Sequence, residues 1–363
     1  MLDKVLKKYD IKGNIVSYNR VGSGNINKTY LLVMDNKKKY LIQQINNKVF
    51  TEPYKLMKNI DGVTSYLKKR IDSNHKVLEV IKTKDNKLLC YILNESNSRE
   101  YYRIYEFIDN AISYDNSIDK EIVFNTGKAF GNFQRLLNDY PMNKLEETIK
   151  GFHDTPRRYR RLMSDIKIDP VNRVCEVKDI IDFIKERKDV CNIIMSGLKD
   201  GSIPYRVTHN DTKVNNVLMN KDTNDYLAVI DLDTVMPGSM LFDYGDGIRS
   251  TASSSSEDET DLNKIYLDMD LFKYYTDGYL SEMASYLNQK EVSLMAESIH
   301  VIATEQVIRF INDYINGDTY FMIKYDKHNL DRARNQLQLV KSIEEHLDEM
   351  SKYIIECYEK YKS

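Results

Sequence analysis

Four polar residues in one segment have the types and the spacing that phosphoryl transfer requires. His209, Asp211 and Asn216 form the pattern HxDxxxxN. Asp231 follows 20 residues after Asp211, at the end of the apolar run LAVI. Phosphoryl transfer to a hydroxyl needs a carboxylate that orients the hydroxyl and accepts its proton, and other oxygen ligands that hold Mg²⁺ against the phosphates. The pattern therefore predicts that Asp211 is the catalytic base and that Asn216 and Asp231 bind the metal.

Two neighbouring residues complete this candidate site. Asp233 lies on the same face as Asp231 if the strand continues, so we expect it to contact a second metal ion or the acceptor. We expect His209 to support the loop through hydrogen bonds rather than to act as a base, because Asp211 is better placed for that role. A carboxylate at the end of an apolar strand is costly when unpaired, and a metal bound to Asp231 would offset that cost.

A glycine turn near the N-terminus is the candidate nucleotide site. The segment VGSGNINKTYLL nearly matches the Walker A pattern GxxxxGKT, but Asn27 stands where the second glycine belongs. A P-loop is followed by a helix, whereas YLLVM reads as a strand. We therefore predict a hairpin turn that closes over the nucleotide phosphates, with Gly22 and Gly24 allowing the backbone to approach them. Lys28 is either a phosphate contact or a solvated charge.

The surrounding periodicity predicts the elements that position these residues. Residues 11–108 read as three strands, a helix and two strands, with apolar positions of the helix spaced along one face. After about residue 112 the pattern becomes helical, because apolar stripes recur at helical spacing and glycine and proline number only 14 and 6. The helical patterns cover 118–139, 176–198, 261–288, 291–315 and 329–361. A short β segment at 205–235 interrupts them and carries the candidate catalytic residues.

Composition excludes several classes of protein. The 363 residues suffice for about two domains, and a net charge of −2 argues against a general nucleic-acid or membrane-surface binder. The four cysteines lack metal-site spacing, so neither a zinc ribbon nor a disulfide framework is expected. No signal peptide or apolar run of 18 residues is visible. We expect a cytoplasmic monomer or small oligomer, with a mobile Ser- and acid-rich loop at 251–260.

Several segments resemble a known superfamily. The chain resembles the aminoglycoside phosphotransferase/choline kinase-like superfamily, which has a protein-kinase-like fold, and within it the N-acetylhexosamine 1-kinases. The segments that carry the resemblance are VGSGNINKTYLL, YLIQQINNKVF, FHDTPRRY, HNDTKVNNVL, VIDLDTVMPGSMLFDYGDGIRS and RFINDYINGDTYF. The resemblance implies an α+β bilobal fold, with a small antiparallel-sheet N-lobe at 1–108, a hinge near 107–111 and a large helical C-lobe at 109–363. ATP would lie between the lobes.

The resemblance also implies an activity and an acceptor site. ATP and Mg²⁺ would be used to phosphorylate the anomeric C1 hydroxyl of GlcNAc or GalNAc. Arg309 resembles a sugar-contacting arginine, since a guanidinium suits fork-like recognition of sugar oxygens. An ion pair between Arg309 and Glu305 or Asp313 is the alternative. Arg249 is also expected near the substrate, and two arginines there argue against a cationic acceptor such as an aminoglycoside.

One departure from the kinase pattern leaves other functions open. Typical kinases carry a lysine on the third strand that contacts the α- and β-phosphates, whereas this strand reads YLIQQIN, with Gln43 or Gln44 at that place. Strand alternation does not decide which glutamine faces the nucleotide. The missing lysine raises the alternative of a catalytically dead kinase-like binding protein. A kinase of the same fold with another acceptor (another sugar, a choline-like amino alcohol or an aminoglycoside) is the further alternative.

Overall fold

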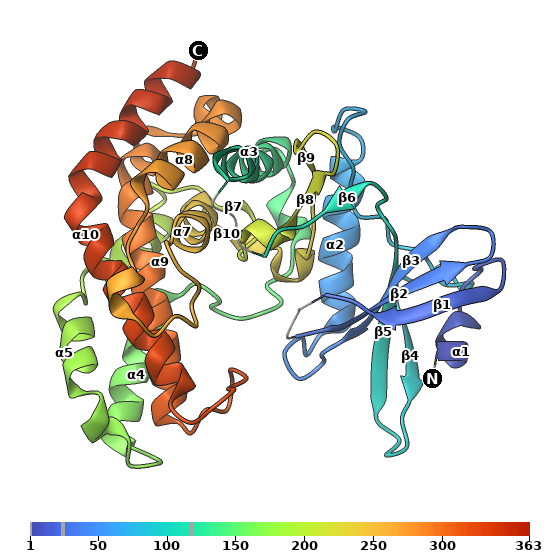
Figure 1. Ribbon diagram of the computed structural model, residues 1–363, viewed down its shortest axis with the longest axis horizontal. Helices are drawn as coiled ribbons and strands as arrows, with labels where there is room; N and C mark the ends of the chain where they lie inside the picture. Colours follow the sequence, from blue (N-terminus) through green and yellow to red (C-terminus); the bar gives the residue numbers. More distant parts are fainter. Residues whose placement is uncertain (1, 23–25, 116–118) are drawn as a thin grey trace.

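The protein has two lobes of different construction. The computed structural model describes residues 2–22, 26–115 and 119–363. The N-terminal lobe contains α1 (Leu2–Leu6), β1 (Ile15–Arg20), β2 (Lys28–Met34), β3 (Lys39–Ile45), α2 (Pro53–Leu67), β4 (Cys90–Leu93) and β5 (Arg99–Glu106). Figure 1 shows this lobe in blue and cyan beside a larger, mainly helical lobe. The predicted α+β bilobal fold class is confirmed.

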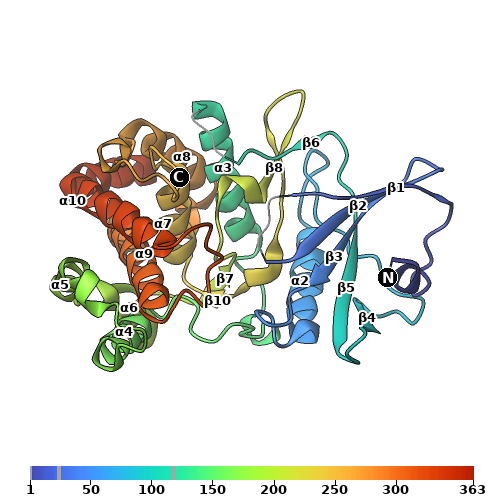
Figure 2. The same cartoon turned by 60° about the horizontal axis from the view of Figure 1, so that its bottom comes forward.

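The N-lobe sheet has two apolar faces. Its five strands pair antiparallel in the order β1-β2-β3-β5-β4. One face packs against α1 through a cluster that includes Tyr40, Ile42 and Ile104. The opposite face packs against α2, whose Leu56 and Ile60 are buried in the cluster that contains Ile45 of β3. Helix α2 lies between the sheet and the C-lobe (Figure 2).

The small strands of the C-lobe surround the predicted catalytic segment. They are β6 (Ala111–Ile112), β7 (Arg206–Thr208), β8 (Val217–Asn220), β9 (Tyr226–Val229) and β10 (Met236–Gly238). Strands β8 and β9 form a hairpin in which Val217 lies opposite Val229, and β6 extends it at the other edge of β8. Strand β7 pairs with β10. The expected short β segment at 205–235 is therefore present as β7, β8 and β9, which belong to two separate antiparallel sheets.

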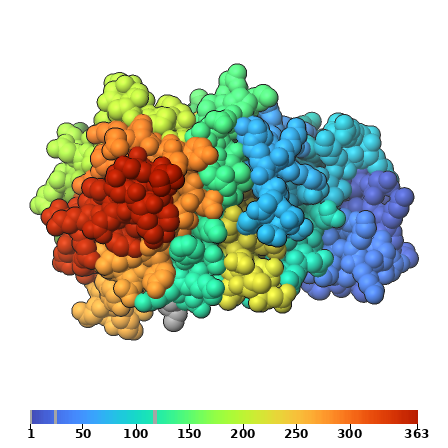
Figure 3. Space-filling view, turned by 90° about the horizontal axis from the view of Figure 1, so that it is seen from above, coloured from blue at the N-terminus to red at the C-terminus, as the bar shows by residue number. Residues whose placement is uncertain are grey.

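Long helices form the rest of the C-lobe. They are α3 (Lys120–Leu136), α4 (Thr155–Ile168), α5 (Lys178–Glu186), α6 (Ile193–Asp200), α7 (Met240–Thr251), α8 (Met269–Met283), α9 (Gln289–Ile315) and α10 (His328–Tyr361). The predicted helices at 118–139, 291–315 and 329–361 correspond to α3, α9 and α10. In the space-filling view of Figure 3, the red C-terminal segment lies toward the end of the molecule opposite the blue N-lobe, beside orange and yellow-green segments.

The single helix expected at 176–198 is wrong. Helix α5 ends at Glu186 and α6 begins at Ile193. Arg187 explains the break: its guanidinium donates to the carbonyl of Phe183 in the last turn of α5 and to both carboxylate oxygens of Glu344 on α10. A side chain that satisfies the last helix carbonyls and is held by a neighbouring helix ends α5 there.

Glycine permits the closest helix contact in the C-lobe. A Cβ atom at Gly127 of α3 would lie 2.2 Å from the carbonyl oxygen of Tyr275, and one at Gly278 of α8 would lie 2.0 Å from that of Phe124. The backbones of α3 and α8 therefore touch at both positions. This packing fixes α3 behind the catalytic segment, where Phe130 and Phe133 contact the ring of His209 edge-on.

The acidic loop at 251–260 is anchored, although we expected it to be mobile. Asp258 pairs with Lys324 and Arg332, and Asn335 of α10 donates to the carbonyls of Ser256 and Glu259. The loop is thus tied to the C-terminal helix region through Asp258 and two of its backbone carbonyls, and to α7 through Glu257, which binds Arg249. Among the described residues, no helix combines the length and the apolar character that crossing a membrane requires.

Candidate active site

One buried carboxylate, that of Asp243 on α7, binds the backbone of the predicted catalytic loop. Asp243, in the first turn of α7, accepts the backbone N–H of His209 at 2.8 Å and that of Asn210 at 2.7 Å, and it also accepts from the side chain of Gln134. Burial raises the pKa of Asp243, although these donors oppose the shift. Asn210 adopts a left-handed conformation with φ of 64°. The loop is therefore fixed where the chain turns sharply, immediately before Asp211.

Asp211 is placed beside a cation. Its carboxylate lies 2.9 Å from Nζ of Lys213 and accepts a hydrogen bond of 3.1 Å from the side-chain amide of Asn216. Burial alone would raise the pKa of Asp211, but Lys213 and Asn216 outweigh it and hold the pKa below its usual range. The side chain keeps 30 % of its surface exposed. An accessible, ionised carboxylate is what a base for a hydroxyl acceptor requires.

His209 has a supporting role, as the sequence predicts. The ring is fully buried. Its Nδ1 accepts the backbone N–H of Asp211, and its Nε2 lies 2.8 Å from the carbonyl oxygen of Ile230, to which it donates. Both ring nitrogens are thus used to join the catalytic loop to the segment before Asp231.

Asn216 and Asp231 emerge at the same end of the β8–β9 hairpin. Asn216 directly precedes β8 and Asp231 follows β9, and the backbone N–H of Ile230 donates to the carbonyl of Asn216. Asp231 adopts a left-handed conformation with φ of 57°. The residue keeps exposed surface, but the protein around its carboxylate desolvates it, and Asp233 and Asp211 lie nearby. Together these effects raise the pKa of Asp231 to about 7.

These donors fit a magnesium ion shared with a nucleotide. The amide nitrogen of Asn216 donates to Asp211, which leaves its carbonyl oxygen for a cation. Burial and the neighbouring carboxylates Asp233 and Asp211 raise the pKa of Asp231 although Arg103 and Lys213 oppose the shift, so a cation bound there would favour the ionised form. Among residues 2–22, 26–115 and 119–363, no group of three or more His, Cys, Asp and Glu side chains could hold a metal. Magnesium commonly takes one or two protein carboxylates plus substrate phosphates, so the two predicted ligands suit it.

Asp233 is buried in a contact with the N-lobe. Its side chain is 5 % exposed, and Oδ1 lies 2.5 Å from Nη1 of Arg103. Its other oxygen accepts from the side chain of Asn27. The prediction that Asp233 contacts a metal or the acceptor would therefore require these two partners to be displaced.

The structure places Gln43 on the sheet face toward α2 and the C-lobe. Gln43 shares the face of Leu41 and Ile45, which pack on the α2 side, because side chains two positions apart in a strand point the same way. Gln44 shares the opposite face with Tyr40 and Ile42. The side chain of Gln43 accepts from Nε of Arg103 and donates to Thr29 of β2, both at 2.9 Å. Of the two glutamines considered for the nucleotide, Gln43 is therefore the one that faces α2 and Arg103, and Gln44 faces the opposite side of the sheet.

The glycine turn joins two antiparallel strands. Strand β1 pairs with β2, and Val21 donates to the carbonyl of Thr29. Gly22 has φ of 80°, a conformation that glycine adopts without strain. A strand, not a helix, follows the turn, so the rejection of a Walker A loop is confirmed. Gly24, the second predicted phosphate contact, lies outside the described residues.

The guanidinium of Arg309 lies close to two aromatic rings in the C-lobe. Its guanidinium carbon is 5.6 Å from the ring centre of Phe152 and 5.5 Å from that of Phe321. Its Nη1 donates to Gln306 one turn earlier. Within the part of the chain that the structure describes, it forms no ion pair with a carboxylate. Since the hydrogen bond to Gln306 uses one of its five N–H donors, the guanidinium keeps other donors for a polar ligand.

The two carboxylates considered as partners of Arg309 have other partners. Glu305 binds His153, Thr155 and Arg158, so the motifs FHDTPRRY and RFINDY meet in the fold. Asp313 accepts backbone N–H groups at the start of the loop after α9. The alternative of an ion pair between Arg309 and either residue is therefore wrong.

The Glu305 cluster connects the arginine to the catalytic region. The ring of His153 stacks on that of Phe242 with centres 5.0 Å apart, and Phe242 directly precedes Asp243, which holds the catalytic loop. Despite burial, the cationic partners lower the pKa of Glu305 to about 2. Contacts from Glu305, one turn before Arg309 on α9, through His153 to Phe242 thus connect the helix that carries Arg309 to the segment that holds the predicted catalytic loop.

Arg249 lies behind the loop rather than open to a ligand. It is 1 % exposed, and its guanidinium donates to Asp246, Glu257 and Gln336. Asp246 in turn accepts the backbone N–H of Thr212. The segment DYGDGIRS, with Asp243, Asp246 and Arg249, therefore supports the predicted catalytic loop. Arg249 is too buried to contact a substrate directly in this conformation.

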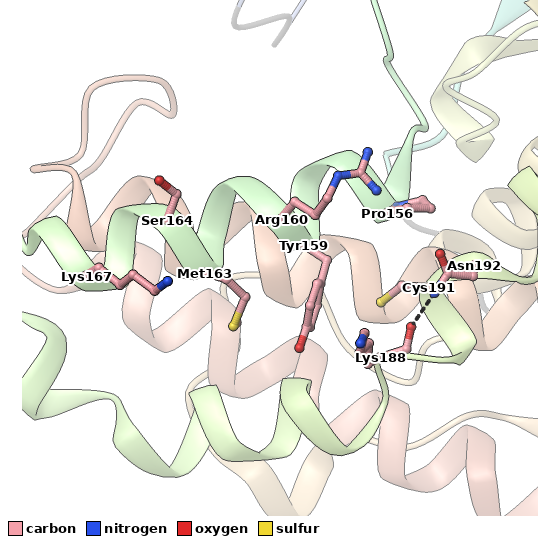
Figure 4. A pocket seen from close by; sticks show the side chains of 9 residues that line it. All are labelled: Pro156, Tyr159, Arg160, Met163, Ser164, Lys167, Lys188, Cys191 and Asn192. Carbon is pink, nitrogen blue, oxygen red and sulfur yellow. Dashed lines mark hydrogen bonds between the residues drawn. The ribbon is translucent and has the colours of Figure 1, made fainter.

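A cavity of about 440 Å³ lies elsewhere, along α4 (Figure 4). Tyr159 and Met163 of α4 line one side and Lys188 and Cys191 the other. None of the predicted site residues lines it. The candidate active site is therefore defined by the loops around Asp211 and Asp231 and not by this cavity.

Two charged residues were missed in the sequence. Lys213 is two positions after Asp211, and Arg103 is a basic residue within the strand pattern YYRIYEF. The signal for Arg103 was present, since a charged residue on an inward strand position needs a partner. Only the fold shows that the partner is Asp233.

Comparison with known proteins agrees with this geometry. The family model described as the phosphotransferase enzyme family, APH, matches residues 17–279. A microcompartment-associated aminopropanol kinase is similar over 96% of this chain and 98% of its own, with a TM-score of 0.65 and 14% identity. An amicoumacin kinase, hAmiN, solved with AMP-PNP, Ca²⁺ and Ami, is similar over 93% and 92%, with a TM-score of 0.63 and 12% identity. A choline kinase from Cryptosporidium parvum Iowa II is similar over 94% and 92%, with a TM-score of 0.57 and 15% identity.

These solved structures share the fold, and the family match covers most of the chain, including the catalytic loop, the β8–β9 hairpin and α7. The protein therefore belongs to the APH phosphotransferase enzyme family.

Proposed function

We propose that the protein is an ATP- and Mg²⁺-dependent kinase that phosphorylates the anomeric C1 hydroxyl of an N-acetylhexosamine, GlcNAc or GalNAc, to the sugar 1-phosphate. The family supports the general reaction, phosphoryl transfer to a hydroxyl. The observation that carries the acceptor is Arg309, whose guanidinium lies close to Phe152 and Phe321 without a carboxylate partner in the described chain.

Asp211 orients the acceptor hydroxyl and receives its proton. Its low pKa keeps it ionised at neutral pH, and the fixed loop holds it in place through Asp243. Lys213, 2.9 Å from Asp211, adds a cation where negative charge gathers on the transferring phosphoryl group. Asn216 and Asp231 would hold Mg²⁺, which neutralises charge on the phosphates when bound.

The acceptor distinguishes this proposal from its main alternative. The solved relatives include kinases of aminopropanol and choline, which are amino alcohols. A cationic acceptor favours carboxylates or open aromatic faces, whereas Arg309 lies close to two rings and Arg158 lies beside Glu305. A neutral sugar with several hydroxyl oxygens and an acetamido oxygen suits the free guanidinium donors better.

The alternative of a catalytically dead protein is less well supported. Asp211, Asn216 and Asp231 are all present and lie together, and Arg103 places a cation next to Gln43. The kinase reading therefore accounts for the ionised base, the metal donors and the charge near the nucleotide strand.

One screen tests the proposal. ATP consumption is measured with GlcNAc, GalNAc, glucose, galactose, choline and kanamycin, with Asp211→Asn as the control for contaminating activity. Turnover restricted to the N-acetylhexosamines, with a phosphorus NMR signal coupled to the anomeric proton, is expected. Turnover with choline or kanamycin alone, or phosphorylation at C6, would overturn the assignment.

A further inference from the structure

Arg103 is a fully buried cation in the N-lobe sheet. It lies in β5 opposite Gln43 of β3, on the face toward α2. Its side chain is 1 % exposed, its Nε donates to Gln43, and its Nη1 lies 3.7 Å from the sulfur of Met57 on α2. Burial of a guanidinium is costly unless a charge and hydrogen bonds compensate it. Its placement therefore needs an explanation beyond packing.

The compensating charge comes from the other lobe. Nη1 of Arg103 lies 2.5 Å from Oδ1 of Asp233, 130 residues later in the chain. Asn27, in the segment after the glycine turn, donates to the second oxygen of Asp233 and accepts the backbone N–H of Asn46 with its own carbonyl. Two N-lobe side chains, Arg103 within β5 and Asn27 just before β2, thus hold one C-lobe carboxylate.

Asp233 belongs to the turn that presents Asp231. The 3₁₀ turn Leu232–Thr234 begins directly after Asp231. The hydroxyl of Thr234 donates to the carbonyl of His209, and the side chain of Asn210 donates to the carbonyl of Thr234. A constraint on Asp233 therefore fixes Asp231 and the catalytic loop together, relative to the strands that carry Gln43 and Thr29.

We propose that Arg103 is a positioning residue for phosphoryl transfer. From β5 it supplies the cation that β3 lacks, and through its ion pair with Asp233 it holds the proposed metal-binding turn against the N-lobe sheet. Asp233 of the C-lobe then connects the two lobes through its contacts with Arg103 and Asn27. The proposal rests on the assignment of Asp231 to the metal within the proposed function, and it requires no particular acceptor.

Two double variants, compared with a single variant and a control, separate the positioning role from folding. Arg103→Met alone leaves Asp233 buried without its cation, so we expect this single variant to be strongly destabilised. Arg103→Met combined with Asp233→Asn removes both charges at similar volume, a change that buried ion pairs usually tolerate. Arg103→Met combined with Gln43→Lys moves the cation to β3 and keeps Asp233. Arg187→Met, which breaks a part-buried pair with Glu344 far from the site, is the matched control.

The measurement is the affinity for ADP by calorimetry, with and without Mg²⁺, together with the melting temperature. For Arg103→Met/Asp233→Asn we expect a folded protein whose affinity for ADP in Mg²⁺ falls about 10- to 100-fold, the usual effect of losing a group that orients a metal ligand. The affinity without Mg²⁺ should change less. Arg187→Met should lower the melting temperature and leave the Mg²⁺ effect unchanged. Arg103→Met/Gln43→Lys should recover most of the lost affinity.

Either of two results would overturn the proposal. One is a folded Arg103→Met/Asp233→Asn protein that binds ADP in Mg²⁺ as tightly as the wild type. The other is a folded Arg103→Met/Gln43→Lys protein whose affinity is no better than that of Arg103→Met/Asp233→Asn. Because no acceptor is present, a wild-type protein that phosphorylates no hexosamine would contradict the proposed acceptor and leave this comparison of ADP affinities valid.

Discussion

The carboxylate of Asp211 lies 2.9 Å from the ammonium group of Lys213, two residues later in the same loop. This ion pair helps to hold the pKa of Asp211 below its usual range, and in the proposed mechanism it places a cation beside the transferring phosphoryl group. The two charges come from one short segment, but their contact depends on the sharp turn at Asn210, which Asp243 of α7 stabilises.

Replacement of Asp211 by Asn should remove the base and keep the loop. We expect kcat to fall by about 10²-fold or more, the usual contribution of a general base, while KM for ATP changes little because Asp211 is not a metal ligand in this scheme. Steady-state kinetics and a melting curve check this. A rate close to that of the wild type would remove Asp211 from the role of base.

Replacement of Asp231 by Ala should abolish Mg²⁺-dependent turnover. The carboxylate is the one charged donor assigned to the metal, and burial together with Asp233 and Asp211 raises its pKa, which a bound cation would oppose. A titration of rate against Mg²⁺ concentration, with Asp225→Ala in the exposed turn before β9 as the control, measures the effect. Activity that still rises with Mg²⁺ in the Asp231→Ala protein would contradict the metal assignment.

Replacement of Arg309 by Ala should weaken acceptor binding more than ATP binding. Loss of hydrogen bonds from a charged group costs about 1.5–3 kcal/mol, which corresponds to a rise of about 10- to 100-fold in KM for the sugar. Arg309→Lys should restore little, since an ammonium group lacks the planar fork. Larger effects on KM for ATP than on KM for the sugar would place Arg309 on the nucleotide side instead.

The buried cluster around Glu305 should make stability depend on pH. Its cationic partners lower the pKa of Glu305 from an ordinary 4.5 to about 2 in the folded protein. A carboxyl whose folded pKa is depressed stabilises the protein above its unfolded pKa and loses that contribution as pH falls toward the folded pKa. The contribution is about 3 kcal/mol above pH 5, and it should decline between about pH 4.5 and 2.

Urea unfolding of the wild type and of Glu305→Gln tests this dependence. The wild type should be the more stable protein at pH 7, and the difference in unfolding free energy should shrink as the pH falls through this range. Asp258, whose pKa is also lowered to about 2, is present in both proteins and cancels in the difference. A difference that stays constant from pH 7 to 3 would show that the charge of Glu305 is not what stabilises the cluster.

The sequence by itself determined the kinds of element and the catalytic signature. Apolar periodicity defined the three strands, helix and two strands of the N-lobe and the long helices α3, α9 and α10, because burial of one face imposes a regular spacing. The pattern HxDxxxxN and the distant Asp231 pointed to phosphoryl transfer, since few chemistries need those donors at that spacing.

Only the tertiary structure decided the partners of the charged residues. Sequence spacing could not choose between Gln43 and Gln44, pair Arg103 with Asp233 or place Arg249 behind the predicted catalytic loop. It also could not show that Glu305 pairs with His153 and Arg158 rather than forming an ion pair with Arg309. Local periodicity reports which face of an element is buried, whereas an ion pair depends on which distant element covers that face. Buried charges must find such partners across the fold, so their roles become visible only when the two lobes are assembled.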